Sequence, residues 1–372
     1  MAEEIIDPTQ LKGAPHPRET VHLIGQEAAE SIFLEAFMKG RLHHAWLIIG
    51  PRGVGKATLA WRIARFLLAS PAQDPSDVFG TLSPKNLDID PEHPVAKRVA
   101  AGSDPRLKFL HRTINEKTNR LRDQIITDDV RSMANFFNMS ATDGGRRIVI
   151  IDAADNLNPN AANALLKMLE EPPERTTLLL ICHQPTRLLP TIISRCRTLR
   201  LKKLTIDQTA LAVAQAGFSA TSDGAALAEL SSGSVGDALR LSLYDGLKKY
   251  NEIIAIFGSM PNLDRSRVLA LAEETGQRGT EAQFDFLYNL IEIVLTRLAR
   301  TGATGQPPTV EAANNEAAIL SRLAPNSVHA RIWAEVAQTT LTRARRGKAV
   351  NLDPAALVLD TFFKFQNTAS ML

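Results

Sequence analysis

Cysteine is nearly absent from this chain, since Cys182 and Cys196 are its only two among 372 residues. Both stand in or beside apolar, strand-like sequence, and two such residues make neither a disulfide framework nor a set of metal ligands. We therefore expect buried thiols, a reducing compartment and no bound metal.

Long apolar runs are absent too. No run reaches the roughly 18 residues that a membrane-spanning helix requires. Residues 1–10 are acidic and polar rather than basic and then apolar. The sequence therefore predicts a cytoplasmic protein that does not enter a membrane.

Excess charge of either sign is small. The chain carries 43 lysine and arginine residues against 40 aspartate and glutamate residues, a formal net charge of +3, and this balance does not by itself indicate nucleic-acid binding. Basic residues gather only in the stretches Arg106–Arg122 and Arg343–Lys348. The simplest interpretation of each stretch is a solvated helix face, and the alternative is contact with acidic partner surfaces or with DNA phosphates.

Length and apolar content are those of a globular protein with more than one domain. At 372 residues the chain exceeds the usual size of one hydrophobic core. Its 44% hydrophobic and 22% charged residues are close to the globular average. We expect two or three domains.

Short apolar runs and helical patterns alternate in the first half of the chain. Ala45–Ile49, Arg147–Ile151 and Leu178–Cys182 each suit a strand that is buried on both faces, and Ala57–Ala69 has helical spacing. Strands that alternate with helices predict an α/β domain in which a parallel sheet is the middle of three layers.

Proline and polar residues mark the limits of these elements. Asn158 followed by Pro159 signals the start of another helix, and Pro172 with Pro173 signals its end. The segment Ser70–Pro94 carries prolines at positions 71, 75, 84, 91 and 94. No long regular element can cross it, so we interpret it as an irregular excursion.

The pattern changes after about Lys203, where helical periodicity replaces strand patterns. One helix face is outlined by Phe284, Leu287, Ile291, Val294 and Leu298. The rest of the chain is predicted to be helical. Packing within a domain explains this face, although a helical oligomerisation domain would have the same pattern.

The strongest local signal is a GxxxxGK sequence between the predicted strand and helix, formed by Gly50, Pro51, Arg52, Gly53, Val54, Gly55 and Lys56. In this context the glycines let backbone N–H groups point into one concavity and the helix start adds positive partial charge. The lysine then reaches the β- and γ-phosphates. The sequence predicts a loop that holds a nucleoside triphosphate by its phosphates.

The metal-binding side of this site is incomplete. The residue after the lysine is ordinarily Ser or Thr, whose hydroxyl binds Mg²⁺, but here it is Ala57. Thr58 does not replace it, because one helical step turns a side chain by roughly 100°. Asp152, at the end of an apolar strand, is placed to hold Mg²⁺ through water, although it could also cap the next helix. The glutamate expected after it is Ala153, so the general base is missing.

Two further motifs resemble the clamp-loader branch of the AAA+ ATPases. They are Asn163–Pro173, which reads NALLKMLEEPP, and Ser194–Cys196, which reads SRC. The resemblance starts at Ile24–Glu27, which is similar to the family's adenine-side segment, and runs to Arg240, with a weaker continuation. It implies an AAA+ P-loop domain over 1–204, a helical lid over 205–275 and a helical collar for oligomerisation over 276–372.

The resemblance also assigns roles to single residues. In this family the arginine of SRC enters the ATP site of the neighbouring subunit and stabilises the transferred phosphoryl group, and Arg195 matches it. An arginine paired with a local carboxylate is the alternative. Gly236 stands where active loaders carry an arginine that senses their own γ-phosphate.

The chain lacks the expected catalytic side chains at positions 57, 153 and 236 but retains Arg195. This pattern is similar to that of an accessory, largely non-hydrolysing subunit of the bacterial DNA polymerase III clamp loader. Such a subunit assembles with gamma/tau motor subunits and the delta subunit. The complex loads the beta sliding clamp onto primer-template DNA for a DNA-directed DNA polymerase. No polymerase activity of its own is expected, and its ATPase activity should be weak or absent.

The ligands implied by the resemblance are ATP or ADP with Mg²⁺, weakly held. Many relatives also carry a four-cysteine zinc module between the phosphate loop and the second motif. No cysteine occurs there in this chain, so zinc is not expected.

Two other functions compete with this interpretation. An active ATPase motor of the gamma/tau type would share the fold and Arg195, but Ala57, Ala153 and Gly236 oppose it. A small-molecule kinase would use the same phosphate loop, but the NALLKMLEEPP and SRC motifs are foreign to that class.

Overall fold

The computed structural model describes residues 9–70, 84–115, 118, 120–138, 145–218, 224–276 and 281–372. The chain folds into two units. The first comprises residues 1–219 and 232–239, and the second comprises residues 220–231 and 240–372. The three-part division into 1–204, 205–275 and 276–372 stays a prediction.

The first unit is built on a five-stranded parallel sheet with the order β2–β5–β6–β1–β7. All residues of β1 and β6 are buried, as the predicted double-sided burial requires. The strands are β1 (Ala45–Ile49), β2 (Leu107–His111), β5 (Arg147–Asp152), β6 (Thr176–Cys182) and β7 (Arg197–Arg200).

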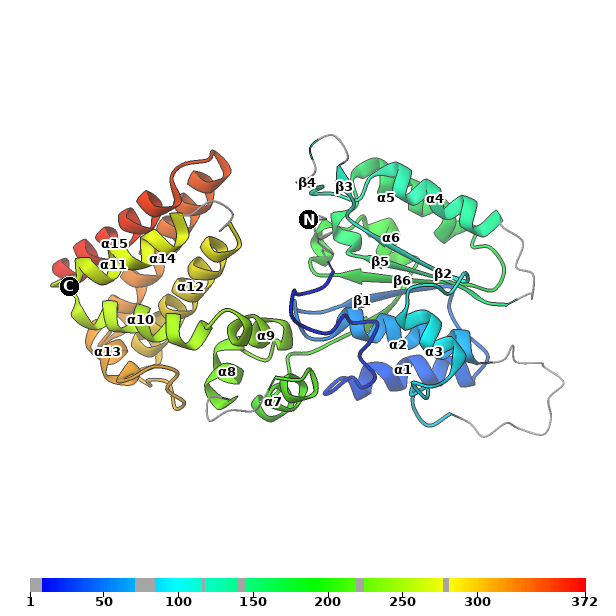
Figure 1. Ribbon diagram of the computed structural model, residues 1–372, viewed down its shortest axis with the longest axis horizontal. Helices are drawn as coiled ribbons and strands as arrows, with labels where there is room; N and C mark the ends of the chain where they lie inside the picture. The colour runs from blue at the N-terminus through cyan, green and yellow to red at the C-terminus, as the bar shows by residue number, and fades with distance from the viewer. Residues whose placement is uncertain are drawn as a thin grey trace, which may run out of the picture. The chain divides into compact units, whose positions relative to one another are not determined.

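Helices cover both faces of this sheet (Figure 1). Trp46 and Ile48 pack toward one helical layer, whereas Leu47 and Ile49 pack toward the other, because successive side chains of a strand alternate. The first layer contains α1 (Glu27–Met38), α2 (Lys56–Ala69) and α3 (Pro94–Ala100), and the second contains α4 (Thr127–Asn138), α5 (Pro159–Glu170) and α6 (Pro190–Ser194). The prediction of a three-layer α/β fold is confirmed.

The helix boundaries follow the signals in the sequence. Asn158 Oδ1 accepts a hydrogen bond from the Ala161 N–H at 2.7 Å, and Pro159 is the first residue of α5. In the proline-rich segment, residues 84–93 form no helix or strand before α3 begins at Pro94. Residues 71–83 of that segment lie outside the described residues.

The basic stretch Arg106–Arg122 is not a helix face, and that interpretation was wrong. It contains β2 and the antiparallel pair β3 (Ile114–Asn115) and β4 (Arg120–Leu121). Phe109 packs into the core on the α2 side of the sheet, and Leu110 is buried on the opposite side. Lys108 interrupts the apolar run of this strand and obscured the alternation.

All regular elements described after β7 are helices, as predicted. The first unit adds α7 (Ile206–Gln215), α9 (Val235–Leu243) begins in it, and the second unit contains α8 (Gly224–Ser231), α10 (Gly246–Ser259), α11 (Arg265–Gly276), α12 (Glu281–Thr304), α13 (Glu316–Leu323), α14 (Ser327–Ala349) and α15 (Pro354–Met371). Short 3₁₀ turns occur at η1 (Ala154–Asn156) and η2 (Pro185–Arg187).

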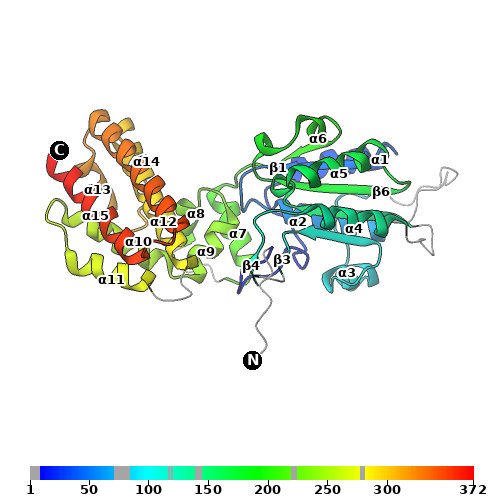
Figure 2. The same cartoon turned by 90° about the horizontal axis from the view of Figure 1, so that it is seen from above.

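The predicted apolar face of α12 forms the core of the second unit. Phe284, Leu287, Ile291, Val294 and Leu298 are all buried there. Figure 2 shows α12 beside α14 and α14 beside α15 in this unit. Among the described helices, none is long and apolar enough to cross a bilayer.

The second basic cluster lies on the exposed face of α14, as the solvated-helix interpretation predicted. Arg343 pairs with Asp360 at 3.3 Å, Arg345 with Glu292 at 2.5 Å, and Lys348 with Asp285 at 2.6 Å. These cations join α14 to α15 and α12.

A buried ionic cluster fixes the loop before α13. Glu316 is fully buried, and its carboxylate accepts hydrogen bonds from Arg297 Nε at 2.7 Å, the Tyr250 hydroxyl at 2.6 Å and the Ala312 N–H at 2.8 Å. Arg297 also pairs with Glu229 at 3.0 Å. Burial and the Glu316 carboxylate raise the pKa of Tyr250, so its hydroxyl stays protonated as a donor.

Replacing Glu316 should therefore destabilise the second unit. Glu316→Ala leaves the Arg297 guanidinium and the Tyr250 hydroxyl buried without this partner, and we expect a loss of about 3–5 kcal/mol in the free energy of unfolding. Urea unfolding followed by helical circular dichroism measures it. Glu335→Ala, at an exposed position of α14, is the control. A Glu316 variant as stable as this control would contradict the prediction.

Candidate nucleotide-binding site

The GxxxxGK sequence forms a tight loop between the carboxyl end of β1 and the start of α2. Gly53 and Gly55 have φ angles of +72° and +97°, which favour glycine. A Cβ on Gly53 would also lie 2.2 Å from Ser234 Oγ. Both the backbone conformation and the neighbouring segment therefore require glycine at position 53.

Lys56, the first residue of α2, is almost completely buried in this loop. Its ammonium donates hydrogen bonds to the carbonyl oxygens of Gly50, at 2.7 Å, and of Pro51. Burial lowers its pKa to about 8, and the negative charges of Asp152 and Asp155 oppose this effect. At neutral pH the side chain is mostly protonated, as phosphate binding requires.

The other predicted loop residues occupy different environments. Arg52 and Pro51 are exposed, Val54 is buried, and Ala57 and Thr58 are half-buried on the first turn of α2. Ala57 packs against the apolar core between sheet and helices, where it offers no oxygen to a metal ion.

Gln26 ties the loop to a distant segment. Its amide nitrogen donates to the carbonyl oxygens of Val54 at 3.2 Å and Lys202 at 2.8 Å, and its amide oxygen accepts from the Lys202 N–H at 3.1 Å. Gln26 belongs to the predicted adenine-side segment, but no pattern in the sequence indicated this bridge.

Two acidic residues stand at the carboxyl end of β5. Asp152 ends the strand, and Ala153, where the glutamate was expected, is 3% exposed. Asp155 accepts hydrogen bonds from the backbone N–H groups of His183 at 3.0 Å and Gln184 at 3.1 Å. Asp155 therefore joins the carboxyl ends of β5 and β6.

His183 is a second polar residue of this edge that sequence reasoning missed. Its Nδ1 atom is buried and has no hydrogen-bond partner among the described residues. Burial and the charge of Lys56 lower its pKa to about 4, so the imidazole is neutral at physiological pH. Its position directly after a buried strand was the signal that could have identified it.

Gly236 packs directly against the phosphate loop. Its N–H donates to the Gly53 carbonyl oxygen at 3.1 Å, and a Cβ at position 236 would lie 3.0 Å from Gly53 Cα. The segment is held in turn by the Leu204 N–H, which donates to the Gly233 carbonyl oxygen at 3.0 Å. A larger residue at 236 would have to displace the loop.

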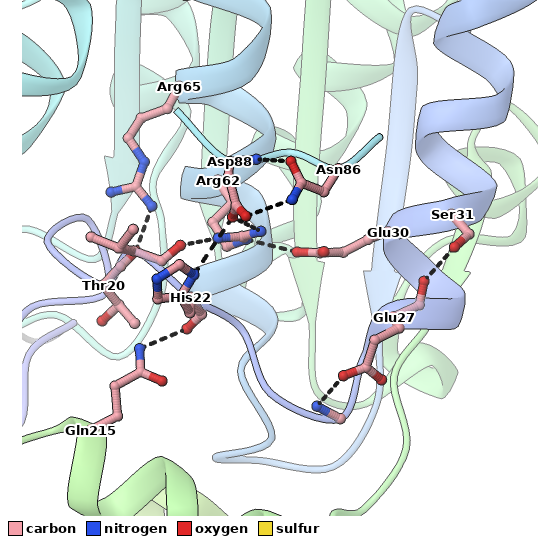
Figure 3. A network of polar contacts seen from close by, with 12 residues as sticks. Thr20, His22, Glu27, Glu30, Ser31, Arg62, Arg65, Asn86, Asp88 and Gln215 are labelled. Atoms are coloured by element: carbon pink, nitrogen blue, oxygen red, sulfur yellow. Dashed lines mark hydrogen bonds and ion pairs between the residues drawn. The ribbon is translucent and has the colours of Figure 1, made fainter. Parts of the chain in front are cut away.

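The segment before α1 is held on α2 by two buried arginines (Figure 3). Arg62 lies between Glu30, at 2.7 Å, and Asp88, at 3.0 Å, and also donates to the Val21 carbonyl oxygen. Arg65 donates to the carbonyl oxygens of Arg18, at 2.9 Å, and Thr20. The segment that precedes Ile24–Glu27 is thereby fixed beside α2.

Gln215 of α7 also holds this segment, since its side chain donates to the His22 carbonyl oxygen at 3.0 Å (Figure 3). Gln208, at the start of α7, lies against Gly25, where a Cβ would be 2.9 Å from its Oε1 atom. Within the first unit, α7 and the adenine-side segment therefore pack together.

These residues fit the phosphates of a nucleotide better than they fit Mg²⁺. The loop keeps its glycines, the helix start and Lys56. Of the expected metal ligands only Asp152 is present, because position 57 has no hydroxyl. Among the described residues there is no group of three or more His, Cys, Asp or Glu side chains that could hold a metal ion.

Both cysteines are free thiols. Cys182 is buried at the end of β6, and Cys196 is partly buried after Arg195. Burial raises the pKa of each to about 12, so both stay protonated.

Arg195 lies at the end of α6 and has a local carboxylate partner. Its Nη2 atom is 2.8 Å from Glu170 Oε1, and its Nη1 atom donates to the Thr191 carbonyl oxygen at 3.1 Å. The Arg195 side chain is 36% exposed. Arg195 is thus paired with a local carboxylate, as the alternative interpretation predicted. Its role as an arginine finger in the ATP site of a neighbouring subunit stays a prediction.

Comparison with known proteins agrees with the motifs. Residues 25–205 match the model of the family described as DNA polymerase III, delta subunit. The chain is similar to the DNA polymerase III subunit delta' of Pseudomonas aeruginosa, with 41% identity over 153 residues that span 41% of each chain. It is also similar to subunit delta' of Escherichia coli, with 32% identity over 206 residues, 52% of this chain and 56% of that one. These matches cover less than two thirds of either relative.

Matches to tau subunits and to solved structures are weaker. The Escherichia coli subunit tau is 28% identical over 192 residues, which span 52% of this chain and 27% of that one. A gamma subunit-related protein from Thermotoga maritima has a TM-score of 0.40 and 17% identity, with 91% of this chain and 99% of that chain covered.

The affinity of the loop for nucleotide should fall at alkaline pH. With a pKa of about 8 in the free protein, Lys56 loses its charge above that pH, and ADP binding should weaken by up to about tenfold per pH unit. Titration with a fluorescent ADP at a series of pH values measures this. Lys56→Met should bind weakly with a flat profile, and Lys203→Met, at an exposed position, should behave as the parent. If the ADP affinity of Lys56→Met fell with rising pH as steeply as that of the parent, the assignment of the pH dependence to Lys56 would be contradicted.

The contact between Gly236 and Gly53 should be sensitive to a single methyl group. Gly236→Ala places a Cβ against Gly53 Cα, and we expect a loss of about 1–3 kcal/mol from overpacking with faster hydrogen exchange in residues 50–56. Gly224→Ala is the control, because a Cβ there meets nothing within 4 Å. Equal exchange in both variants would show that the contact does not hold the loop.

Proposed function

We propose that the chain is an accessory clamp-loader subunit that hydrolyses little or no ATP itself, a role supported by the match of residues 25–205 to the family model described as DNA polymerase III, delta subunit. It would assemble with gamma/tau motor subunits and the delta subunit, and support ATP-dependent loading of the beta clamp onto primed DNA. The helices from residue 276 onward would serve as its collar in that assembly.

The observation that carries this proposal is the state of the catalytic positions around the phosphate loop. Ala57 offers no hydroxyl for Mg²⁺, and Ala153 is buried and offers no carboxylate to polarise water. At Gly236 the backbone occupies the space beside Gly53 where an arginine would have to fit. All three sites therefore oppose hydrolysis.

Binding of a nucleotide without turnover is compatible with the same residues. ATP or ADP would be held by the loop N–H groups, the start of α2 and the Lys56 ammonium. Lys56 would exchange its bonds to the Gly50 and Pro51 carbonyl oxygens for bonds to phosphate oxygens. Mg²⁺, if it accompanies the nucleotide, would rely on Asp152.

Arg195 supports a role in a neighbouring subunit. It is half-exposed on the surface of the first unit, and its permanent positive charge suits the developing charge of a γ-phosphoryl group in transfer. A chain that lacks hydrolytic parts but presents such an arginine can assist the hydrolysis of a neighbour. An active motor of the gamma/tau type is the second candidate, supported by the retained Lys56 and Asp152.

Steady-state ATP hydrolysis tests the proposal. The purified chain alone should show negligible turnover. In a mixture with motor subunits, delta, clamp and primed DNA, the parent chain should support stimulated hydrolysis. Robust turnover by the chain alone would contradict the accessory role and favour the motor.

Arg195→Ala should leave assembly intact and slow DNA-stimulated hydrolysis. At the one site that the residue serves, the loss should be on the order of 10³-fold, the effect of removing an arginine finger. Arg187→Ala, at an exposed arginine of η2, should not change the rate. An unchanged rate in Arg195→Ala would refute the finger assignment.

A further inference from the structure

The carboxylate of Glu170 is the side-chain partner of Arg195. Glu170 is the last residue of α5, and Arg195 follows the last residue of α6. The guanidinium contacts Glu170 Oε1 through Nη2 at 2.8 Å and the Thr191 carbonyl oxygen through Nη1 at 3.1 Å. Because both Nη atoms of this planar group are engaged, the orientation of the guanidinium is restricted.

Buried neighbours fix the backbone on both sides of this pair. Leu169, next to Glu170, is buried, and its carbonyl oxygen is 3.0 Å from His44 Nε2, just before β1. Ile192, within α6, is fully buried against the sheet. Glu170 therefore extends from the end of α5, and Arg195 from the residue directly after α6, beside backbone that buried side chains hold in place.

The pair is exposed enough to leave Arg195 available. The two side chains are 36% and 49% exposed, and such pairs hold weakly. A guanidinium also carries more N–H donors than these two contacts use. Arg195 can therefore bind a phosphate group while it remains in contact with Glu170.

We propose that Glu170 is a positioning residue for Arg195, which holds the guanidinium extended at the surface so that it meets the phosphates of a nucleotide bound by a neighbouring subunit. This inference rests on the proposed function of Arg195. The side chain is ordered before the subunits meet, so less conformational entropy is lost on contact. Without Glu170 the guanidinium samples other rotamers and is misplaced for much of the time.

The test measures DNA-stimulated ATP hydrolysis by the reconstituted loader that contains the full chain. Glu170→Ala should lower kcat at the served site by about two- to fivefold, the scale set by a weakly held exposed ion pair, with KM for ATP unchanged. Glu170→Gln keeps a hydrogen-bond acceptor and should lose less. Glu171→Ala removes the neighbouring exposed carboxylate and is the matched control.

A double-variant cycle separates positioning from a general structural effect. In the Arg195→Ala background, Glu170→Ala should cause no further loss, because the residue acts through Arg195. An equal loss in both backgrounds, or no loss in the parent background while Arg195→Ala is impaired, would overturn the inference. If Arg195→Ala itself is fully active, the proposed function fails first.

Discussion

The central strands of the sheet are covered by helices on both faces, and this burial determines where polar chemistry can occur. Residues of β1 and β6 alternate between two apolar layers, so none of them can face a ligand from within the strand. Polar groups that could meet a ligand at this sheet instead stand at the carboxyl ends of the strands and directly after them. In a parallel sheet these carboxyl ends lie at one edge, which brings together the phosphate loop, Asp152, Asp155 and His183.

The contacts at this edge of the sheet explain why the phosphate loop keeps its structure although the catalytic side chains at 57, 153 and 236 are missing. Its glycines, the Gln26 bridge and the Gly236 contact are backbone-directed, so they persist when the side chains at 57, 153 and 236 are small. Lys56 is satisfied by carbonyl oxygens of its own loop. A scaffold with this construction stays folded whether or not the chain hydrolyses a nucleotide.

The sequence allowed prediction of features that are local. The phosphate loop, its flanking strand and helix, the cap at Asn158 and the apolar face of α12 each depend on residues a few positions apart. Features that join distant segments could not be predicted. The Gln26 bridge to Lys202 and the packing of Gly236 on Gly53 require knowledge of the tertiary fold. Strand β2 was missed for a different reason, because Lys108 within it and Arg106 and Arg112 beside it resemble a solvated surface.

The two arginines that hold the segment before α1 have a consequence for how this chain can diverge. Arg62 and Arg65 bind main-chain carbonyl oxygens of Arg18, Thr20 and Val21. Every amino acid supplies such an oxygen, so the attachment is indifferent to which side chains the segment carries. This attachment therefore places no demand on the side chains of residues 18–21, whereas it requires the guanidinium groups at positions 62 and 65.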